Sequence, residues 1–380
     1  AHIFDKIGSA NFNLGRYAIA INHLNQALKL RRRLNKKEDI APLLIKIGNT
    51  YLKNSEFDKA IESFQESLAL SKAIGRNDLV GLNLNGIGIV SQVQGKLKEA
   101  YSFFMKALKV AREQKMEADI GRILANLATI DMSWGNFEKA IPNFKKFLEI
   151  SKRQKNSQGT AEAYLKLGVA HRSKGENEKA LFFIDKAQNI FEKTKNKGGL
   201  ASIKYLKGGF EYESGMLIKA ERNYKEAVNI YRELHLENSI EYANARNGLG
   251  LVYAAKGKFD EAIKSHQVAK NIFQKSGFKN LTALAINYIG HVHRELGQFD
   301  KANNKYQEVI NIYKNAGAEA EIARVLGSLG LLNFKVRKFQ KGIDNFLKAA
   351  SIFKKHGNEL RLAAAYTNIG HGYSYIKKYE

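Results

Sequence analysis

A repeat of about 40 residues constrains the fold of this 380-residue chain more than any other feature. The stretch GNFEKAIPNFKKFLEI at 135–150 returns with small changes as SEFDKAIESFQESLAL from Ser55 and GKLKEAYSFFMKALKV from Gly95. One small residue recurs at the same place in every copy, at Gly8, Gly48, Gly88, Ala128, Gly168, Gly208, Gly250, Gly290, Gly330 and Gly370. Self-similarity at this period indicates stacked supersecondary units that bury one another's apolar faces.

Each copy reads as two amphipathic helices joined by a tight turn, because apolar residues recur at spacings of three and four in both halves. The predicted turns lie seven residues after the small residue, at Gly15, Ser55, Gly95, Gly135, Gly175, Gly215, Gly257, Gly297, Arg337 and Lys377. The second helix then carries a small residue and, one turn later, a large one, such as Ala60 and Phe64. Small residues let two helices approach closely, and the large residue fills the groove.

These residues resemble the signature of the tetratricopeptide repeat (TPR). The resemblance includes an aromatic residue three positions after the small one, at Tyr51 and Tyr253. The usual TPR period is about 34 residues, so these repeats are longer by roughly one and a half helical turns. Such long repeats are similar to those of the Pins and LGN polarity adaptors and of bacterial regulatory arrays. The resemblance implies an all-α, right-handed superhelical solenoid of about nine to ten helix-turn-helix repeats.

No Pro/Ser-rich linker interrupts the pattern, so we expect residues 1–380 to form a single continuous array. Ala1 would already lie in a first helix, and the sequence stops at KKYE, where another second helix should begin. Because terminal repeats normally have a polar outer face, we expect the array to be truncated at both ends. No apolar run approaches the roughly 20 residues of a membrane span. We therefore expect no membrane association and a cytoplasmic location.

The TPR resemblance implies that a peptide or partner helix binds in a concave groove lined by the first helix of each repeat. Carried onto this sequence, the groove positions hold Lys46, Asn49, Asn85, Arg122, Asn126, Lys166, Arg172, Asn247, Asn287, His291, Arg294 and Arg324. Asparagine is a poor helix former, and its amide offers both a donor and an acceptor for a peptide backbone. Alternatively, Asn85, Asn247 and Asn287 bond to neighbouring helices or solvent. The family's carboxylate clamp is matched fully only at Asn49, so recognition of chaperone tails is not expected.

The chain is strongly basic, with 62 Lys and Arg against 37 Asp and Glu and a formal net charge of +25. Basic runs such as RRRLNKK from Arg31 and SKRQK from Ser151 recur near the ends of the second helices, which places them on one rim of the array. Favourable interaction of cations with helix C-termini explains that placement. A field of this sign would also attract an acidic partner. Nucleic acid is the weaker alternative, because no recognised motif is present and acidic residues are interspersed.

Catalytic and metal sites are not expected. The glycines at 86–88 and 248–250 lie inside helical patterns without a preceding strand, unlike those of a phosphate-binding loop. His291 and His371 are two repeats apart, and His293 points to a different helix face from His291. The absence of cysteine removes thiolate chemistry. The sequence therefore predicts a protein- or peptide-binding scaffold without enzyme activity or cofactor, with an acidic segment as partner. The alternative is a sensory or regulatory arm of a larger protease, kinase or cyclase.

Overall fold

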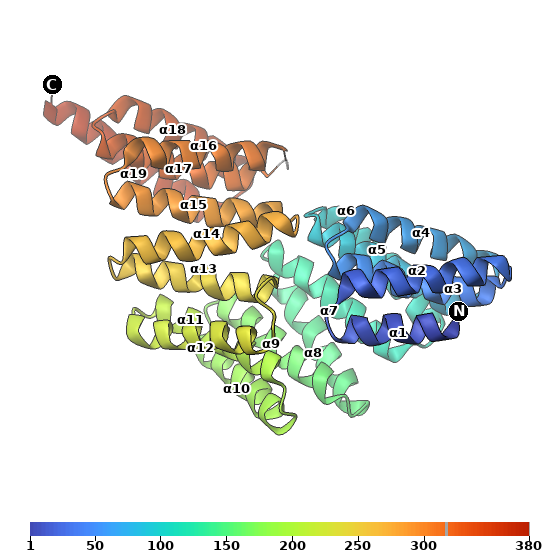
Figure 1. Cartoon of the computed structure of the whole chain (residues 1–380). Helices are drawn as coiled ribbons and strands as arrows, with labels where there is room; N and C mark the ends of the chain where they lie inside the picture. The colour runs from blue at the N-terminus through green and yellow to red at the C-terminus, as the bar shows by residue number, and fades with distance from the viewer. Residues whose placement is uncertain (316–317, 380) are drawn as a thin grey trace. The chain divides into compact units, whose positions relative to one another are not determined.

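The computed structural model describes residues 1–315 and 318–379, and within them the chain forms nineteen α-helices joined by short turns. The chain divides into two compact units, Ala1–Leu200 and Ala201–Glu380 (Figure 1). The first unit contains α1 (His2–Asn13), α2 (Tyr17–Arg33), α3 (Lys37–Lys53), α4 (Phe57–Ala73), α5 (Asn77–Val93), α6 (Leu97–Glu113), α7 (Glu117–Ser133), α8 (Phe137–Arg153), α9 (Ser157–Ser173) and α10 (Asn177–Lys193).

The second unit contains α12 (Leu217–Glu233), α13 (Ile240–Ala255), α14 (Phe259–Lys275), α15 (Lys279–Glu295), α16 (Phe299–Asn315), α17 (Glu319–Lys335), α18 (Phe339–Lys355) and α19 (Glu359–Tyr379), and α11 (Lys197–Glu213) crosses the boundary. Within each unit, odd- and even-numbered helices pair as hairpins, such as α5 with α6 and α13 with α14, and even-numbered helices also pack on the next odd-numbered one, such as α4 on α5 and α14 on α15. The predicted all-α architecture of stacked helical hairpins is confirmed.

The turns form where the recurrent glycines predict them. At Gly95 the backbone φ is +81°, and its N–H donates to the carbonyl of Gln92 at 3.0 Å while Lys96 N–H donates to Ser91 at 2.9 Å. This hydrogen-bond pair closes a helix with a left-handed residue, a conformation that glycine adopts without steric cost. The predicted turn at Lys377 is wrong, because α19 continues to Tyr379. Only three residues follow Lys377 in this sequence, too few to form a helix that could pack back onto α19.

Close contact between small and large residues holds neighbouring hairpins together, as predicted. Phe64 of α4 is fully buried between Gly48 of α3 and Gly86 of α5. A Cβ atom would lie 2.9 Å from the Phe64 ring if added to Gly48, and 2.7 Å if added to Gly86. Because carbon atoms in van der Waals contact are about 3.5–4.0 Å apart, only glycine leaves room for the ring.

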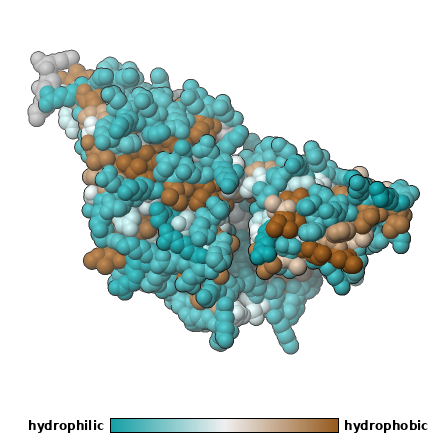
Figure 2. Space-filling model, in the orientation of Figure 1, coloured by the Kyte–Doolittle hydropathy of each residue, from teal (hydrophilic) through white to brown (hydrophobic). Residues whose placement is uncertain are grey.

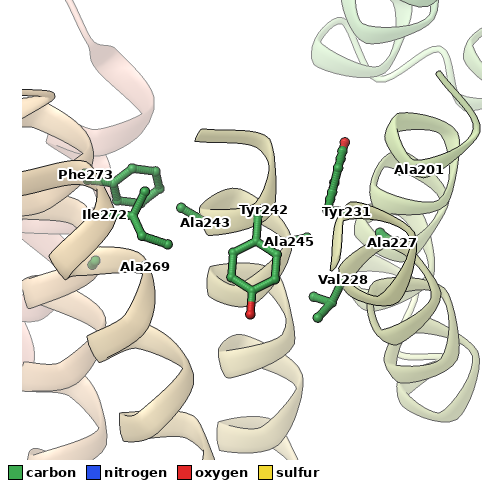
Figure 3. Close-up of a cluster of buried hydrophobic side chains, with 11 residues drawn as sticks. Ala201, Ala227, Val228, Tyr231, Tyr242, Ala243, Ala245, Ala269, Ile272 and Phe273 are labelled. Carbon is green, nitrogen blue, oxygen red and sulfur yellow. The ribbon is translucent and has the colours of Figure 1, made fainter. Parts of the chain in front are cut away.

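The core of the second unit adds an aromatic ladder near the ends of its even-numbered helices. Figure 3 shows Tyr231 of α12 and Phe273 of α14 on the two sides of α13, with Ala243 and Ala245 between them. Tyr231, Phe273, Tyr313 and Phe353 are all buried at this recurrent position. Burial of large aromatic side chains beside alanine fills the space between closely packed helices.

The odd-numbered helices also contact one another across hairpins. In the first unit α3 contacts α5 and α5 contacts α7, and in the second unit α13 contacts α15 and α15 contacts α17. We call the solvent-facing side of these odd-numbered helices the inner face of each unit. Hydrophilic residues cover most of the surface visible in Figure 2, with separate apolar patches. Among the described residues, no helix combines the length and hydropathy needed to cross a bilayer.

Candidate binding face

An asparagine pair links two odd-numbered helices on the inner face of the first unit. The Nδ2 atom of Asn126 on α7 donates to the Oδ1 atom of Asn85 on α5 at 3.0 Å, and both side chains are partly buried. The bond uses the amide oxygen of Asn85 and one amide hydrogen of Asn126. The amide nitrogen of Asn85 and the oxygen of Asn126 lie outside it, so the pair presents one donor and one acceptor group.

Lysine 46 on α3 belongs to an ion cluster around Asp5. Its Nζ atom lies 2.8 Å from Asp5 Oδ1, and Arg31 of α2 lies 2.8 Å from Asp5 Oδ2. Burial acts to raise the pKa of Asp5, but hydrogen bonds and charges from Lys46 and Arg31 outweigh it and leave the pKa lowered. The Lys46 side chain remains half exposed. Lys46 therefore supports the hairpin packing and still presents positive charge to solvent.

Two other predicted basic residues of the first unit, Arg122 and Lys166, have acidic neighbours on their own helices. Arg122 is paired with Asp119, and Lys166 Nζ lies 3.6 Å from Glu162 and 6.0 Å from the centre of the Phe144 ring. The predicted Asn49 is exposed on α3, and Arg172 is partly buried near the end of α9. These residues lie on successive odd-numbered helices, as the repeat alignment predicts.

A polar chain joins α15 and α17 in the second unit. Asn287 Nδ2 lies 3.3 Å from His291 Nε2, and the same nitrogen lies 3.2 Å from Ser328 Oγ on α17. The His291 ring also packs edge-on against Tyr306 of α16, with ring centres 5.6 Å apart. Burial lowers the pKa of His291 to about 4, and the charge of Arg294 contributes in the same direction. His291 is therefore neutral at physiological pH and can either donate or accept a hydrogen bond.

Asn247 departs from its predicted place on the groove surface. It is 7% exposed, and its Oδ1 atom lies 2.6 Å from Nδ1 of His266, which is fully buried on α14. Burial, with a smaller contribution from the neighbouring His291, lowers the pKa of His266 to about 3. Because its amide oxygen faces a core side chain, Asn247 fits the alternative in which the asparagines bond to neighbouring helices.

The remaining predicted arginines lie in the last turn of α15 and in the second turn of α17. Arg294 lies 2.8 Å from Glu295, and Arg324 is paired with Glu321. Sequence reasoning did not single out Asp5 or Ser328, although both occupy recurrent positions shortly before Gly8 and Gly330. Extending the repeat alignment to every polar residue at those positions would have found them. No cluster of His, Cys, Asp and Glu suited to a metal ion occurs in the part of the chain that the structure describes.

Comparison with protein families agrees with the helical-repeat fold. The family model described as MalT-like TPR region matches residues 8–198, and a tetratricopeptide repeat model matches residues 199–275 and 250–315. The chain belongs to the tetratricopeptide-repeat superfamily. The TPR resemblance drawn from the repeat residues is thereby confirmed. No curated protein matches the chain in sequence.

Solved TPR-like structures share the fold at low identity. The apo form of the quorum sensor NprR from B. thuringiensis is 16% identical, with a TM-score of 0.60 over 91% of this chain and 99% of that one. A Rap protein complexed with Competence and Sporulation Factor is 16% identical, with a TM-score of 0.58 over 90% and 100%. The STAND protein PH0952 from Pyrococcus horikoshii, which has a TPR sensor, is 17% identical, with a TM-score of 0.52 over 86% and 52%.

Proposed function

We propose that the inner face of this TPR protein binds a peptide or an extended segment of a partner protein and performs no catalysis itself. The observation that carries this proposal is the linkage of successive odd-numbered helices by polar side chains, most of them partly buried. Asn85 pairs with Asn126 in the first unit, and Asn287, His291 and Ser328 form a chain in the second. Amide and imidazole groups held in this way can satisfy the N–H and C=O groups of an extended backbone.

Relatives in fold give this proposal independent support. The Rap protein structure holds Competence and Sporulation Factor, and the Rap conjugation gene regulator of plasmid pLS20 was solved with the Phr* peptide. The second of these is 19% identical with a TM-score of 0.57. Function transferred through fold is an analogy, so the polar groups of this chain remain the primary argument.

We further propose that the bound segment is acidic. Lys46, Arg122 and Arg324 lie on odd-numbered helices with side chains that are 50%, 61% and 43% exposed. Each has a local acidic partner, so the attraction for an incoming carboxylate comes from the net charge of +25 as well as from these individual residues. A field of this sign raises the association rate of an acidic partner more than it lengthens the lifetime of the complex.

A second candidate function is that of a sensor arm in a larger signalling protein. The observation that favours it is the match to PH0952, whose TPR sensor belongs to a STAND protein about twice as long as the matched part. In that setting the inner face would contact another domain of the same chain. Both candidates use the same face.

The test begins with a phage-displayed library of random peptides selected on the intact chain. Selected peptides are then measured by fluorescence anisotropy against the wild type and the Asn85→Ala/Asn126→Ala variant. Asn22→Ala/Asn189→Ala is the matched control, because both residues are exposed on even-numbered helices. Alanine favours helix in both variants, so unfolding does not explain a loss of affinity. We expect weaker binding only in the first variant. Failure to select any peptide, or equal affinities, would contradict the proposal.

A further inference from the structure

The two kinds of turn in this protein both contain a residue with positive φ, but they differ in which residue adopts it. Turns from an odd- to an even-numbered helix place a residue with positive φ at nine positions, and seven of these residues are glycine. Turns from an even- to the next odd-numbered helix have eight such residues in the described ranges, and only three are glycine. In three consecutive turns of the second kind the residue is lysine: Lys115, Lys155 and Lys195, with φ of +53°, +52° and +52°.

The backbone at these lysines has the geometry that glycine adopts elsewhere. Lys155 N–H donates to the carbonyl of Lys152 at 2.9 Å, and Asn156 N–H donates to Ser151 at 2.9 Å. Gly75 makes the corresponding bond to Lys72 at 3.2 Å in the turn of the same kind after α4. A side chain in the left-handed region brings Cβ too close to the following carbonyl oxygen, whereas glycine has no Cβ. Lysine at these turns therefore works against the local backbone preference.

Helix electrostatics do not account for the choice. A cation after the last turn of a helix interacts favourably with the helix dipole. However, the odd-numbered helices end in turns of the same geometry, and their left-handed residues are mostly glycine, as at Gly95, Gly135 and Gly175. The dipole acts at both kinds of turn, but lysine replaces glycine at only one kind.

The three ammonium groups are available to a partner. Lys115, Lys155 and Lys195 are exposed, and none of them takes part in an ion pair within the described ranges. The last two turns are also tied together, because Asn196 Nδ2 donates to Gln158 Oε1 at 2.9 Å. The first two turns are joined by the ion pair of Arg153 with Glu117 at 2.8 Å, so the three lysines follow one another along one edge.

We propose that Lys115, Lys155 and Lys195 form a docking edge for an acidic polypeptide segment of a partner protein. Charge complementarity favours a segment with spaced carboxylates, because Glu113 and Glu192 are exposed on the same edge of the first unit and would repel a dense phosphate backbone, whereas Glu117 is paired with Arg153. The edge consists of turn residues outside the inner face and does not depend on the function proposed for that face.

The test uses a variant that removes these charges and the backbone strain together. In Lys115→Gly/Lys155→Gly/Lys195→Gly, relief of the left-handed strain opposes the entropy cost of glycine, so we expect an unchanged or higher Tm. The matched control is Lys98→Gln/Lys109→Gln/Lys145→Gln, which removes three exposed lysines from even-numbered helices of the same unit. The probes are a fluorescein-labelled polyglutamate peptide and an oligothymidylate of equal length, each measured by anisotropy over a salt series.

We expect polyglutamate to bind the glycine variant about tenfold more weakly than it binds the charge-matched control. Equal weakening in the two variants would overturn the proposal, because net charge alone would then explain binding. A marked fall in Tm would also overturn it, since the lysines would then be structural. Tighter binding of oligothymidylate, with affinity falling steeply as salt increases, would assign the edge to nucleic acid instead. A peptide selected on the inner face should bind the glycine variant and the charge-matched control with equal affinity, which separates this proposal from the proposed function.

Discussion

Mild acid should destabilise the second unit through its two buried histidines. Burial lowers the pKa of His266 to about 3 and that of His291 to about 4. In the unfolded chain both histidines have a pKa of about 6.5. Since the folded pKa values lie below the unfolded ones, the unfolded state binds more protons below about pH 6.5. The stabilisation is therefore complete above that pH and is lost as the pH falls toward the folded values.

The magnitude follows from the distance between the assay pH and the unfolded pKa. At about pH 5, each histidine is about 1.5 pH units below its unfolded pKa, which corresponds to roughly 2 kcal/mol at about 1.4 kcal/mol per unit. The two together lower the free energy of unfolding by about 4 kcal/mol, a large share of the usual 5–15 kcal/mol. The groups around them offer little compensation, because Asn247, Tyr288 and Tyr306 are neutral and the charges of Arg294 and Glu295 act on His291 in opposite directions.

Between about pH 7.5 and pH 5 the histidines titrate in the unfolded chain, whereas the carboxylates do so only at lower pH. Hydrogen bonds from Lys225 and then Lys256 lower the pKa of Glu221 to about 2, and the pKa of Asp5 is also lowered. The stability that such carboxylates contribute is present above their unfolded pKa of about 4 and is lost only below it. Between about pH 7.5 and pH 5 their contribution changes little, so the histidines dominate the difference.

The assay is urea unfolding followed by far-UV circular dichroism at both pH values. His266→Phe is the decisive variant, because phenylalanine occupies the equivalent buried position at Phe64, Phe104 and Phe346. In this variant the fall in the free energy of unfolding between about pH 7.5 and pH 5 should be smaller by about 2 kcal/mol. The control is His235→Asn, since His235 is exposed at φ +54°, a conformation that asparagine tolerates. An unchanged stability of the wild type at pH 5, or equal pH dependence in the two variants, would refute the reasoning.

Two further predictions concern the packing of the first unit and its ion cluster. Gly48→Ala should lower the free energy of unfolding by about 1–3 kcal/mol, because the new Cβ would lie 2.9 Å from the Phe64 ring. Gly327→Ala, where the nearest atom lies 3.8 Å away, should be neutral or stabilising, and urea unfolding of both variants checks the difference. Asp5→Asn should cost about 1–3 kcal/mol at neutral pH by leaving two cations without their carboxylate. The difference in free energy of unfolding between wild type and variant should shrink in acid as wild-type Asp5 becomes protonated. Equal free energies of unfolding for the two proteins at neutral pH would count against this prediction.

Local sequence determined the hairpins and most of the turns. Apolar spacing defines one buried face on each helix, and a residue able to adopt positive φ ends it, as at Gly95 and Gly135. These preferences involve residues within a few positions of one another, so they can be read without knowing what packs nearby. The prediction was wrong at Lys377, where a turn depends on a following helix that packs back rather than on the residue itself.

Tertiary structure decided what the recurrent asparagines do. Asn85, Asn247 and Asn287 each lie three residues before a recurrent glycine, and the repeat alignment treats them alike. In the fold, Asn85 accepts a hydrogen bond from Asn126 of the next odd-numbered helix. Asn247 is buried against His266 of its own hairpin. Asn287 contacts His291, which in turn contacts Ser328 of the next odd-numbered helix. Sequence position fixes the helix face on which an amide lies. Its exposure and partner depend on side chains that packing brings in from 19 to 41 residues away, and a periodic pattern does not specify these.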